Sequence, residues 1–86
     1  MKVILLPLAE RQLKLLGKAV QIVVSRKIRE PFFVSNKEEK LKGHKNIFRV
    51  RVGDYRIVYR KSGDQIFIVL LGHRKEIYRL LKSLLR

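Results

Sequence analysis

The stretch that decides the fold is residues 48–59, which read F-R-V-R-V-G-D-Y-R-I-V-Y. Apolar and basic residues alternate on both sides of a central Gly-Asp pair, as they do in two half-buried strands that a two-residue turn connects. Gly53 at the first turn position suits a type II′ turn, and a type I′ turn is the alternative. Either turn predicts a β-hairpin in which Arg51 lies opposite Arg56.

This hairpin is predicted to have one apolar and one cationic face, because the side chains of a strand alternate between two faces. The apolar face carries Phe48, Val50, Val52, Tyr55, Ile57 and Tyr59, and the cationic face carries Arg49, Arg51, Arg56 and Arg60. Like charges directly opposite each other destabilise a strand pair by up to about 1 kcal/mol. The arginines either tolerate this repulsion on a solvated surface or relieve it with a bound anion, which is our working hypothesis.

The composition indicates one globular domain, residues 1–86, with an anionic partner. Apolar residues make up 47% of the 86 positions, which is typical of a folded chain and is enough for one small core. The 21 Lys and Arg residues exceed the seven Asp and Glu residues, which gives a formal net charge of +14. Such a charge favours nucleic acid, an anionic membrane or an acidic protein as partner. Nucleic acid is the first choice, and a membrane is not expected because no helix has an aromatic interfacial face.

Several classes of function are excluded or disfavoured by what the sequence lacks. Without cysteine there are no disulfides and no thiolate metal sites. The seven carboxylates form no recognisable metal-ligand spacing with His44 or His73, so we expect no metal and no cofactor. The longest apolar run, residues 66–71, is too short to span a bilayer, and the N-terminal residues do not resemble a signal peptide. We therefore expect a cytoplasmic protein.

The N-terminal third is predicted to form a strand and two helices. A short aliphatic run, residues 3–6, ends at Pro7, after which the apolar period changes to that of a helix. Gly17 is expected to separate two helices, and Pro31 to stop the second one. The first helix is expected to bury Ala9, Leu13, Leu16 and Val20, and the second Val20, Val23, Val24 and Ile28.

The rest of the chain is predicted to supply loops, one more strand and a C-terminal helix. Residues 32–46 are expected to be irregular, with Phe32, Phe33 and Val34 as apolar anchors. A turn at 61–64 leads into a strand at 65–71, which a break at 72–74 ends. The C-terminal helix has an apolar stripe of Ile77, Leu80, Leu81, Leu84 and Leu85.

Together these elements predict an α+β fold: a small, mainly antiparallel sheet with the helical hairpin packed on one face, and a C-terminal helix. If Arg60 pairs with Gln65, then Arg56 lies opposite Val69. Phe67 and Val69 are then expected beside the arginines, on a surface that is both basic and apolar and suits a nucleic-acid base or a partner peptide.

Three segments in this order resemble the RelE/ParE superfamily of toxins from type II toxin-antitoxin systems. They are L-K-G at 41–43, the hairpin at 48–59, and G-H-R-K-E-I-Y at 72–78. The resemblance covers nearly the whole chain and implies the same α+β fold. For the RelE branch it also implies ribosome-dependent, metal-free endonucleolytic cleavage of mRNA in the A site, which inhibits translation. It implies, finally, a cognate RelB-like antitoxin with an acidic segment that covers the arginine face or displaces the C-terminal helix.

The resemblance also suggests site residues. Family members use basic residues at the positions of Arg49, Arg51 and Arg56, an arginine at Arg74 and often a tyrosine at Tyr78. These five are the expected catalytic residues, and further RNA-binding residues are expected at Lys42, Lys45, Arg60 and His73.

The chemistry of these residues can be argued independently. In metal-free cleavage the ribose 2′-hydroxyl attacks its own phosphate in line, so the protein must orient the strand and stabilise phosphoryl charge. Guanidiniums suit this task because they offer planar, paired donors and stay charged. We expect Arg51 and Arg56 to bind the scissile phosphate and Arg74 to assist at the transition state.

The general base is the unresolved part of this site. Family members commonly carry lysine at position 49, whereas a guanidinium such as that of Arg49 almost never gives up its proton. Tyr78 and His73 are the alternatives, followed by His44, and Tyr78 is equally suited to stack on a flipped nucleotide. Without a base, cleavage would depend on electrostatics and on the ribosome.

Two other functions stay open: a ParE-like toxin that inhibits DNA gyrase, and a catalytically weak relative that only binds RNA or the ribosome.

Overall fold

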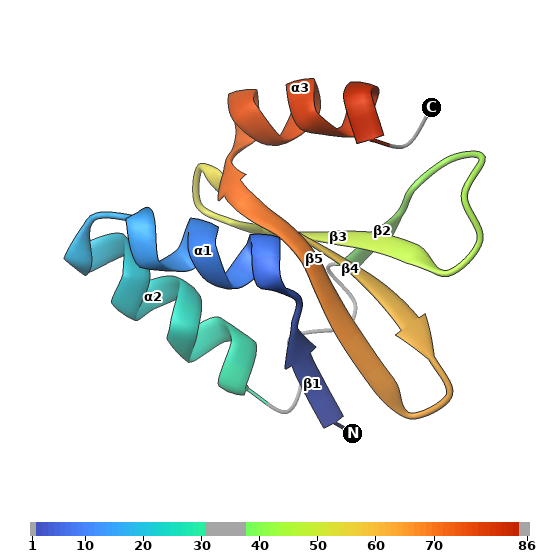
Figure 1. Ribbon diagram of the computed structural model, residues 1–86, viewed down its shortest axis with the longest axis horizontal. Helices are drawn as coiled ribbons and strands as arrows, with labels where there is room; N and C mark the ends of the chain where they lie inside the picture. The colour runs from blue at the N-terminus through green and yellow to red at the C-terminus, as the bar shows by residue number, and fades with distance from the viewer. Residues whose placement is uncertain (1, 31–37, 85–86) are drawn as a thin grey trace.

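A mixed five-stranded sheet with helices on both faces organises the chain (Figure 1). The computed structural model describes residues 2–30 and 38–84. In chain order the elements are β1 (Lys2–Leu5), α1 (Pro7–Leu15), α2 (Lys18–Arg29), β2 (Glu38–Lys40), β3 (Ile47–Val52), β4 (Tyr55–Ser62), β5 (Gln65–His73) and α3 (Arg74–Leu84). The predicted α+β fold is therefore confirmed.

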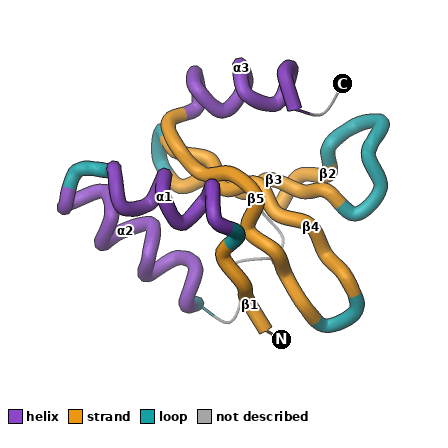
Figure 2. The backbone as a smooth tube through the Cα atoms, in the orientation of Figure 1, coloured by secondary structure: helices purple, strands orange, loops and turns teal. Residues whose placement is uncertain are grey.

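The sheet has the strand order β1-β5-β4-β3-β2 (Figure 2). The four later strands pair in antiparallel fashion, and β1 pairs with β5 in parallel. A parallel pair needs a long crossover connection, and α1, α2 and the later strands together provide it between β1 and β5. The N-terminal strand therefore closes one edge of the sheet, and β2 closes the other.

The hairpin of β3 and β4 has the predicted register. Val52 lies opposite Tyr55, and Arg51 lies opposite Arg56. Gly53 has a φ of 60°, whereas Asp54 does not have a positive φ. A type II′ turn requires a positive φ at its first central residue alone, so the structure selects this turn over type I′.

The register predicted for β4 and β5 is wrong in two places. A two-residue turn, Gly63 and Asp64, joins the strands, so that Ser62 pairs with Gln65 and Arg60 with Phe67. A bulge then follows, because Val58 pairs with Leu70 and Tyr59 with Ile68, which leaves Val69 as the extra residue. Arg56 consequently lies opposite Gly72 instead of Val69. The strand also continues through Gly72 to His73, where a break was expected.

The helical hairpin follows the predicted boundaries closely. Pro7 begins α1, as suits a residue without a backbone donor, and Gly17 precedes α2. Val24 and Ile28 are buried, and Val20 packs against them. Val23 was expected inside but is 52% exposed, because it lies a quarter-turn away from this stripe.

The structure adds one strand that was not predicted, β2, within the segment expected to be irregular. The residues expected to stop α2 and to anchor the following loop, Pro31, Phe32, Phe33 and Val34, lie outside the described residues, as does Leu85. Within the described residues α2 ends at Arg29.

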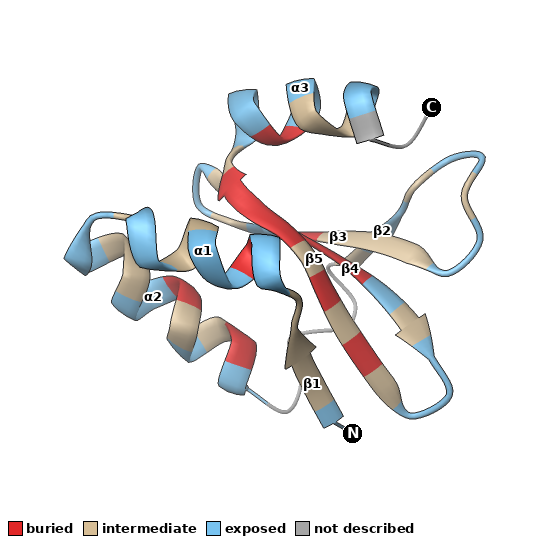
Figure 3. Ribbon diagram, in the orientation of Figure 1, coloured by how far each residue is buried: buried red, intermediate tan, exposed pale blue. Residues whose placement is uncertain are grey.

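Each face of the sheet packs against different helices, and β4 and β5 carry most of the buried positions (Figure 3). The α1/α2 face joins Ala9, Val24 and Ile28 to Val50, Ile57, Tyr59, Ile66, Ile68 and Leu71. The α3 face joins Ile77 to Val58 and Leu70, with Leu41, Ile47, Val69, Leu80 and Leu81 packed around them. None of the helices in residues 2–30 and 38–84 combines the length and apolarity that crossing a bilayer requires.

Candidate functional site

The turn between β3 and β4 gathers two of the predicted catalytic arginines. The Gly53 carbonyl oxygen accepts a hydrogen bond from Arg51 Nε at 3.2 Å and another from Arg56 Nη1 at 3.0 Å. Arg56 Nη1 also donates to the Tyr55 carbonyl oxygen at 3.0 Å. Arg51 is exposed, whereas Arg56 is only 9% exposed. The turn thus holds one exposed and one nearly buried guanidinium at the same acceptor.

A third predicted arginine is held at the same end of the sheet. Arg74 is the first residue of α3, and its backbone nitrogen donates to the Asp54 carbonyl oxygen at 2.8 Å. This bond fastens the start of the helix to the hairpin turn that carries Arg51 and Arg56. The side chain of Arg74 is exposed. These three arginines are called the arginine cluster below.

Arg49 lies further along β3, on the same face of the sheet, and its contacts are different. Its Nε and Nη2 atoms lie 3.3 and 3.2 Å from Glu39 Oε2. Its guanidinium carbon lies 5.3 Å from the centre of the Tyr78 ring, which is a cation–π contact. The structure therefore brings the predicted residues Arg49 and Tyr78 together, and adds Glu39.

Arg60 stands near the far end of β4. Its guanidinium lies 4.8 Å from the centre of the Phe67 ring on the neighbouring strand. The prediction that Phe67 lies beside an arginine is confirmed. Val69, by contrast, packs against the α3 core, because the bulge moves it out of the predicted register. The cationic face thus carries a guanidinium beside an aromatic ring in two places.

His73 does not join the arginine cluster. It pairs with Tyr55, whose ring it meets edge-to-face at 5.7 Å, and Tyr55 packs on the α1/α2 core. Its Nδ1 accepts a hydrogen bond from the Lys75 backbone nitrogen at 3.3 Å. With Gln12, Leu15 and other residues it lines a hollow of about 280 Å³ between α1 and the start of α3. The His73 ring therefore lies on the α1/α2 side of the sheet, where it accepts a hydrogen bond from the first turn of α3.

The predicted RNA-binding lysines Lys42 and Lys45 lie in the loop between β2 and β3, around a hollow of about 460 Å³ that His44 also lines. This loop precedes β3, and the turn that holds the guanidiniums of Arg51 and Arg56 follows it, so the six residues of β3 separate the loop from that turn. At about 3.4 Å per residue the separation is roughly 20 Å. The lysines therefore do not join the arginine cluster.

Sequence reasoning missed the two glutamates of β2, which reach opposite faces of the sheet. Glu39 pairs with Arg49, while Glu38 lies 2.6 Å from Lys61 Nζ and accepts a hydrogen bond from the Tyr59 hydroxyl. Burial raises the pKa of Tyr59, and the neighbouring Glu38 carboxylate raises it further. Two adjacent acids in a chain with seven acids in all were the available signal.

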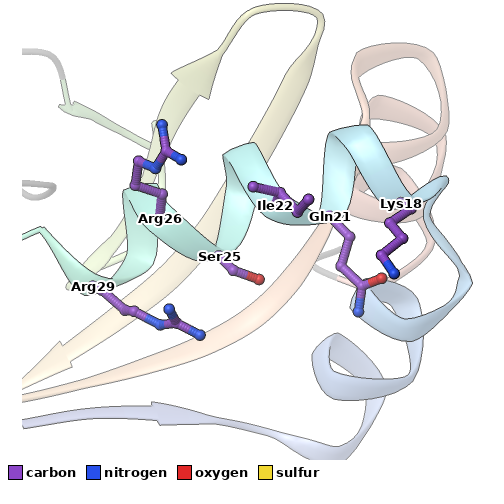
Figure 4. A pocket seen from close by; sticks show the side chains of 6 residues that line it. All are labelled: Lys18, Gln21, Ile22, Ser25, Arg26 and Arg29. Atoms are coloured by element: carbon purple, nitrogen blue, oxygen red, sulfur yellow. The ribbon is translucent and has the colours of Figure 1, made fainter.

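Two other features of the surface bear on possible ligands. In the part of the chain that the structure describes, no group of three or more His, Cys, Asp or Glu side chains could hold a metal ion. Along α2, Lys18, Arg26 and Arg29 surround Ile22 in a shallow hollow of about 410 Å³, which Gln21 and Ser25 complete (Figure 4). This basic surface belongs to the helical hairpin, on the side of the sheet away from the arginine cluster.

Comparisons with known proteins agree with this architecture. A curated relative, toxin RelE3 of Methanocaldococcus jannaschii, is 48% identical over 40 residues. That match covers 46% of each protein, so it spans about half the length of the relative.

Two solved structures are similar over most of the chain. The antitoxin–toxin complex RelB–RelE from Methanococcus jannaschii matches with 29% identity and a TM-score of 0.72, and covers 87% of this chain and 94% of that one. The toxin–antitoxin complex RelBE2 from Mycobacterium tuberculosis has the same fold, with 22% identity, a TM-score of 0.74 and coverage of 85% and 96%. The family model described as ParE toxin of type II toxin-antitoxin system matches residues 3–78. The chain therefore belongs to this toxin family, within the RelE/ParE superfamily.

Proposed function

We propose that this toxin inhibits translation by cleaving mRNA in the ribosomal A site, through a ribosome-dependent reaction that uses no metal ion. The observation that carries the proposal is the arginine cluster. Arg51 and Arg56 donate to one carbonyl oxygen, and the backbone of Arg74 is bonded to the next residue of the same turn. Two guanidiniums at one turn, with the backbone of a third arginine fastened to the same turn, favour the binding of a phosphate.

Each arginine has a role that follows from its surroundings. Arg56 is nearly buried and anchored by two carbonyl oxygens, so its position is fixed before RNA binds. Arg51 and Arg74 are exposed and can close on the phosphate from the sheet and from the helix. Charge that develops on the phosphoryl oxygens is stabilised most by donors that are already oriented. We assign phosphate binding to Arg51 and Arg56 and transition-state stabilisation to Arg74.

As the 2′-oxygen bonds to phosphorus and the bond from phosphorus to the 5′-oxygen breaks, water takes the 2′-hydroxyl proton and water protonates the leaving 5′-oxygen. The arginines contribute orientation and electrostatic stabilisation instead of a strong base. The guanidinium of Arg49 offers only donors, and the Nδ1 atom of His73 is engaged by the hydrogen bond from the Lys75 backbone nitrogen. Tyr78 is 41% exposed beside Arg49, which supports a role for its ring in contacting a nucleotide. The ribosome would hold the mRNA in the in-line geometry that attack by the 2′-hydroxyl on its own phosphate requires.

A RelB-like antitoxin with an acidic segment is the proposed inhibitor of this activity. The described surface has basic areas on both sides of the sheet, namely the arginine cluster and the α2 hollow. The two solved relatives are complexes of a toxin with its antitoxin. A partner that covers the cluster, or displaces α3 and with it Arg74, would stop cleavage. Its affinity is expected to fall with salt, because ion pairs at the surface are screened within about 8 Å at physiological ionic strength.

The direct test is a purified translation system in which mRNA is followed by primer extension with and without ribosomes. Cuts within codons that appear only with ribosomes are expected. Intact mRNA combined with inhibition of DNA gyrase supercoiling would support the ParE-like alternative. Stalled ribosomes with uncut mRNA would identify a relative that binds without cleaving. Either result would overturn the proposal.

A further inference from the structure

Arg49 differs from the other arginines of the cationic face in how its charge is balanced. It lies directly opposite Glu39 in the β2–β3 register, and two of its nitrogens contact Glu39 Oε2. The Arg49 side chain is 25% exposed, which is little for a surface arginine. In contrast, Arg51 and Arg56 donate to carbonyl oxygens, and among the described residues no ion pair involves Arg60. On this face only the charge of Arg49 is matched by a carboxylate within the described chain.

The same guanidinium is also in contact with the Tyr78 ring, at 5.3 Å from its centre. Arg49 is therefore held between a strand on one side and a helix on the other. A planar guanidinium fixed by a carboxylate can lie against an aromatic ring in one orientation, which a flexible ammonium group cannot do. The ring has a second face, and its 41% exposure leaves area on which a base can stack.

We propose that Arg49 is a positioning residue, with Glu39 as its counter-ion, that orients the Tyr78 ring for stacking on an RNA base and does not bind phosphate itself. The inference rests on the proposed function only in taking RNA as the ligand. It divides the cationic face into two parts. The arginine cluster binds the phosphate, and the unit of Glu39, Arg49 and Tyr78 binds the base next to it.

The salt dependence of binding separates these two roles. The probe is a fluorescein-labelled 2′-O-methyl oligoribonucleotide, which cannot be cleaved because its 2′-oxygen is blocked, followed by anisotropy between about 50 and 200 mM KCl. For single strands the slope of log affinity against log salt changes by about 0.7 for each phosphate contact. Arg51→Gln should lower the slope by this amount, and Arg49→Gln should leave it unchanged. Glu39→Gln should raise the slope, because it releases the charge of Arg49.

Neighbouring residues provide matched controls. Glu38→Gln removes an adjacent carboxylate on the opposite face of the sheet, so the slope should not change. Arg60 is the other arginine that lies over an aromatic ring, and it has no ion pair among the described residues. If RNA reaches it, Arg60→Gln should lower the salt slope as Arg51→Gln does. A slope that falls in Arg49→Gln as it does in Arg51→Gln would show that Arg49 binds phosphate and would overturn the inference.

A second readout reports on Tyr78 directly. In an oligonucleotide with 2-aminopurine at the stacking position, fluorescence should be quenched when the base lies on the ring. Tyr78→Leu and Arg49→Gln should both lose the quench and weaken binding about tenfold, with no further loss in the double variant. Arg51→Gln at a saturating protein concentration should keep it. A full quench in Arg49→Gln refutes the positioning role, whereas an unchanged salt slope in Arg51→Gln refutes the proposed phosphate site instead.

Discussion

Arg51 and Arg56 lie directly opposite each other on β3 and β4, and both guanidiniums donate to the Gly53 carbonyl oxygen. Two cations in this position repel each other, at a cost of up to about 1 kcal/mol. The shared acceptor offsets part of that repulsion and keeps both groups at the turn. A phosphate bound at the turn would offset the rest, which is the basis of the phosphate site proposed above.

The first prediction concerns Gly53. Its φ of 60° is a conformation that costs a residue with a side chain about 1–2 kcal/mol, although a Cβ there would meet nothing within 4 Å. Gly53→Ala should lower the free energy of unfolding by this amount, as measured by urea denaturation. It should also reduce mRNA cleavage, because the carbonyl that orients Arg51 and Arg56 belongs to this residue.

Gly63 is the matched control for this change. It has a φ of 61°, has equally open surroundings, and begins the Gly-Asp turn between β4 and β5. Gly63→Ala should destabilise the protein to the same extent without altering the cleavage rate of the folded fraction. Equal losses of activity in both variants would show that stability, and not the position of the two guanidiniums, explains the effect.

The second prediction contrasts the two arginines of this pair in stability. Arg56 is 9% exposed and bonded to two carbonyl oxygens, whereas Arg51 is exposed and bonded to one. Arg56→Gln should lower the free energy of unfolding by about 1–3 kcal/mol, since bonds from charged donors are strong when they are buried. Arg51→Gln should change it by less than about 0.5 kcal/mol. Chemical denaturation of both variants decides between this order and its reverse.

The parts of the fold that the sequence predicted are those with strong local signals. Strict alternation around a Gly-Asp turn fixed the β3–β4 register, because a slip of one residue would have placed arginines in the core. Pro7 and Gly17 marked the helix boundaries for equally local reasons. For the site, the same alternation placed Arg51 opposite Arg56.

The parts that were missed depend on contacts distant in sequence. Residues 38–40 read E-E-K and lack strand propensity, and they pair with β3 because Glu38 and Glu39 find basic partners on opposite faces. Residues 66–71 are apolar at every position, so their pattern fits any register and does not reveal the bulge at Val69. That bulge adds one residue to the alternation, which turns His73 toward the α1/α2 side and away from the arginines.

The third prediction uses the buried Tyr59. Burial, and secondly the Glu38 carboxylate, raise its pKa in the native state, while the unfolded chain keeps a pKa of about 10. The contribution of Tyr59 to stability is therefore fully present below about pH 10 and is lost as the pH rises further, by up to about 1.4 kcal/mol per pH unit.

Tyr59→Phe isolates this effect from the lysines that titrate in the same range. At neutral pH the variant should be less stable by about 1–2 kcal/mol, because the hydrogen bond to Glu38 is lost. Above about pH 10 the difference from the wild-type protein should shrink, since phenylalanine has no proton to release. Urea denaturation curves at several pH values measure the difference, and parallel stability curves for the two proteins would contradict the assignment.

The fourth prediction concerns Arg74, the first residue of α3. A cation at the N-terminal end of a helix is disfavoured by the helix dipole by about 0.3–1 kcal/mol, so Arg74→Ala should leave the protein at least as stable. Removing one donor to a developing oxyanion costs about 100- to 1,000-fold in rate. Arg74→Ala should therefore reduce ribosome-dependent cleavage by this factor and abolish growth inhibition while the circular dichroism spectrum stays unchanged.

Lys75→Ala is the control, because it removes the next cation of the same helical turn. The backbone nitrogen of Lys75 donates to His73 and not to the hairpin turn, so this variant should cleave mRNA at a nearly normal rate. Full toxicity in Arg74→Ala would show that Arg74 does not stabilise the transition state. Equal losses of cleavage in both variants would show that the net charge of the surface, and not Arg74 itself, determines the rate.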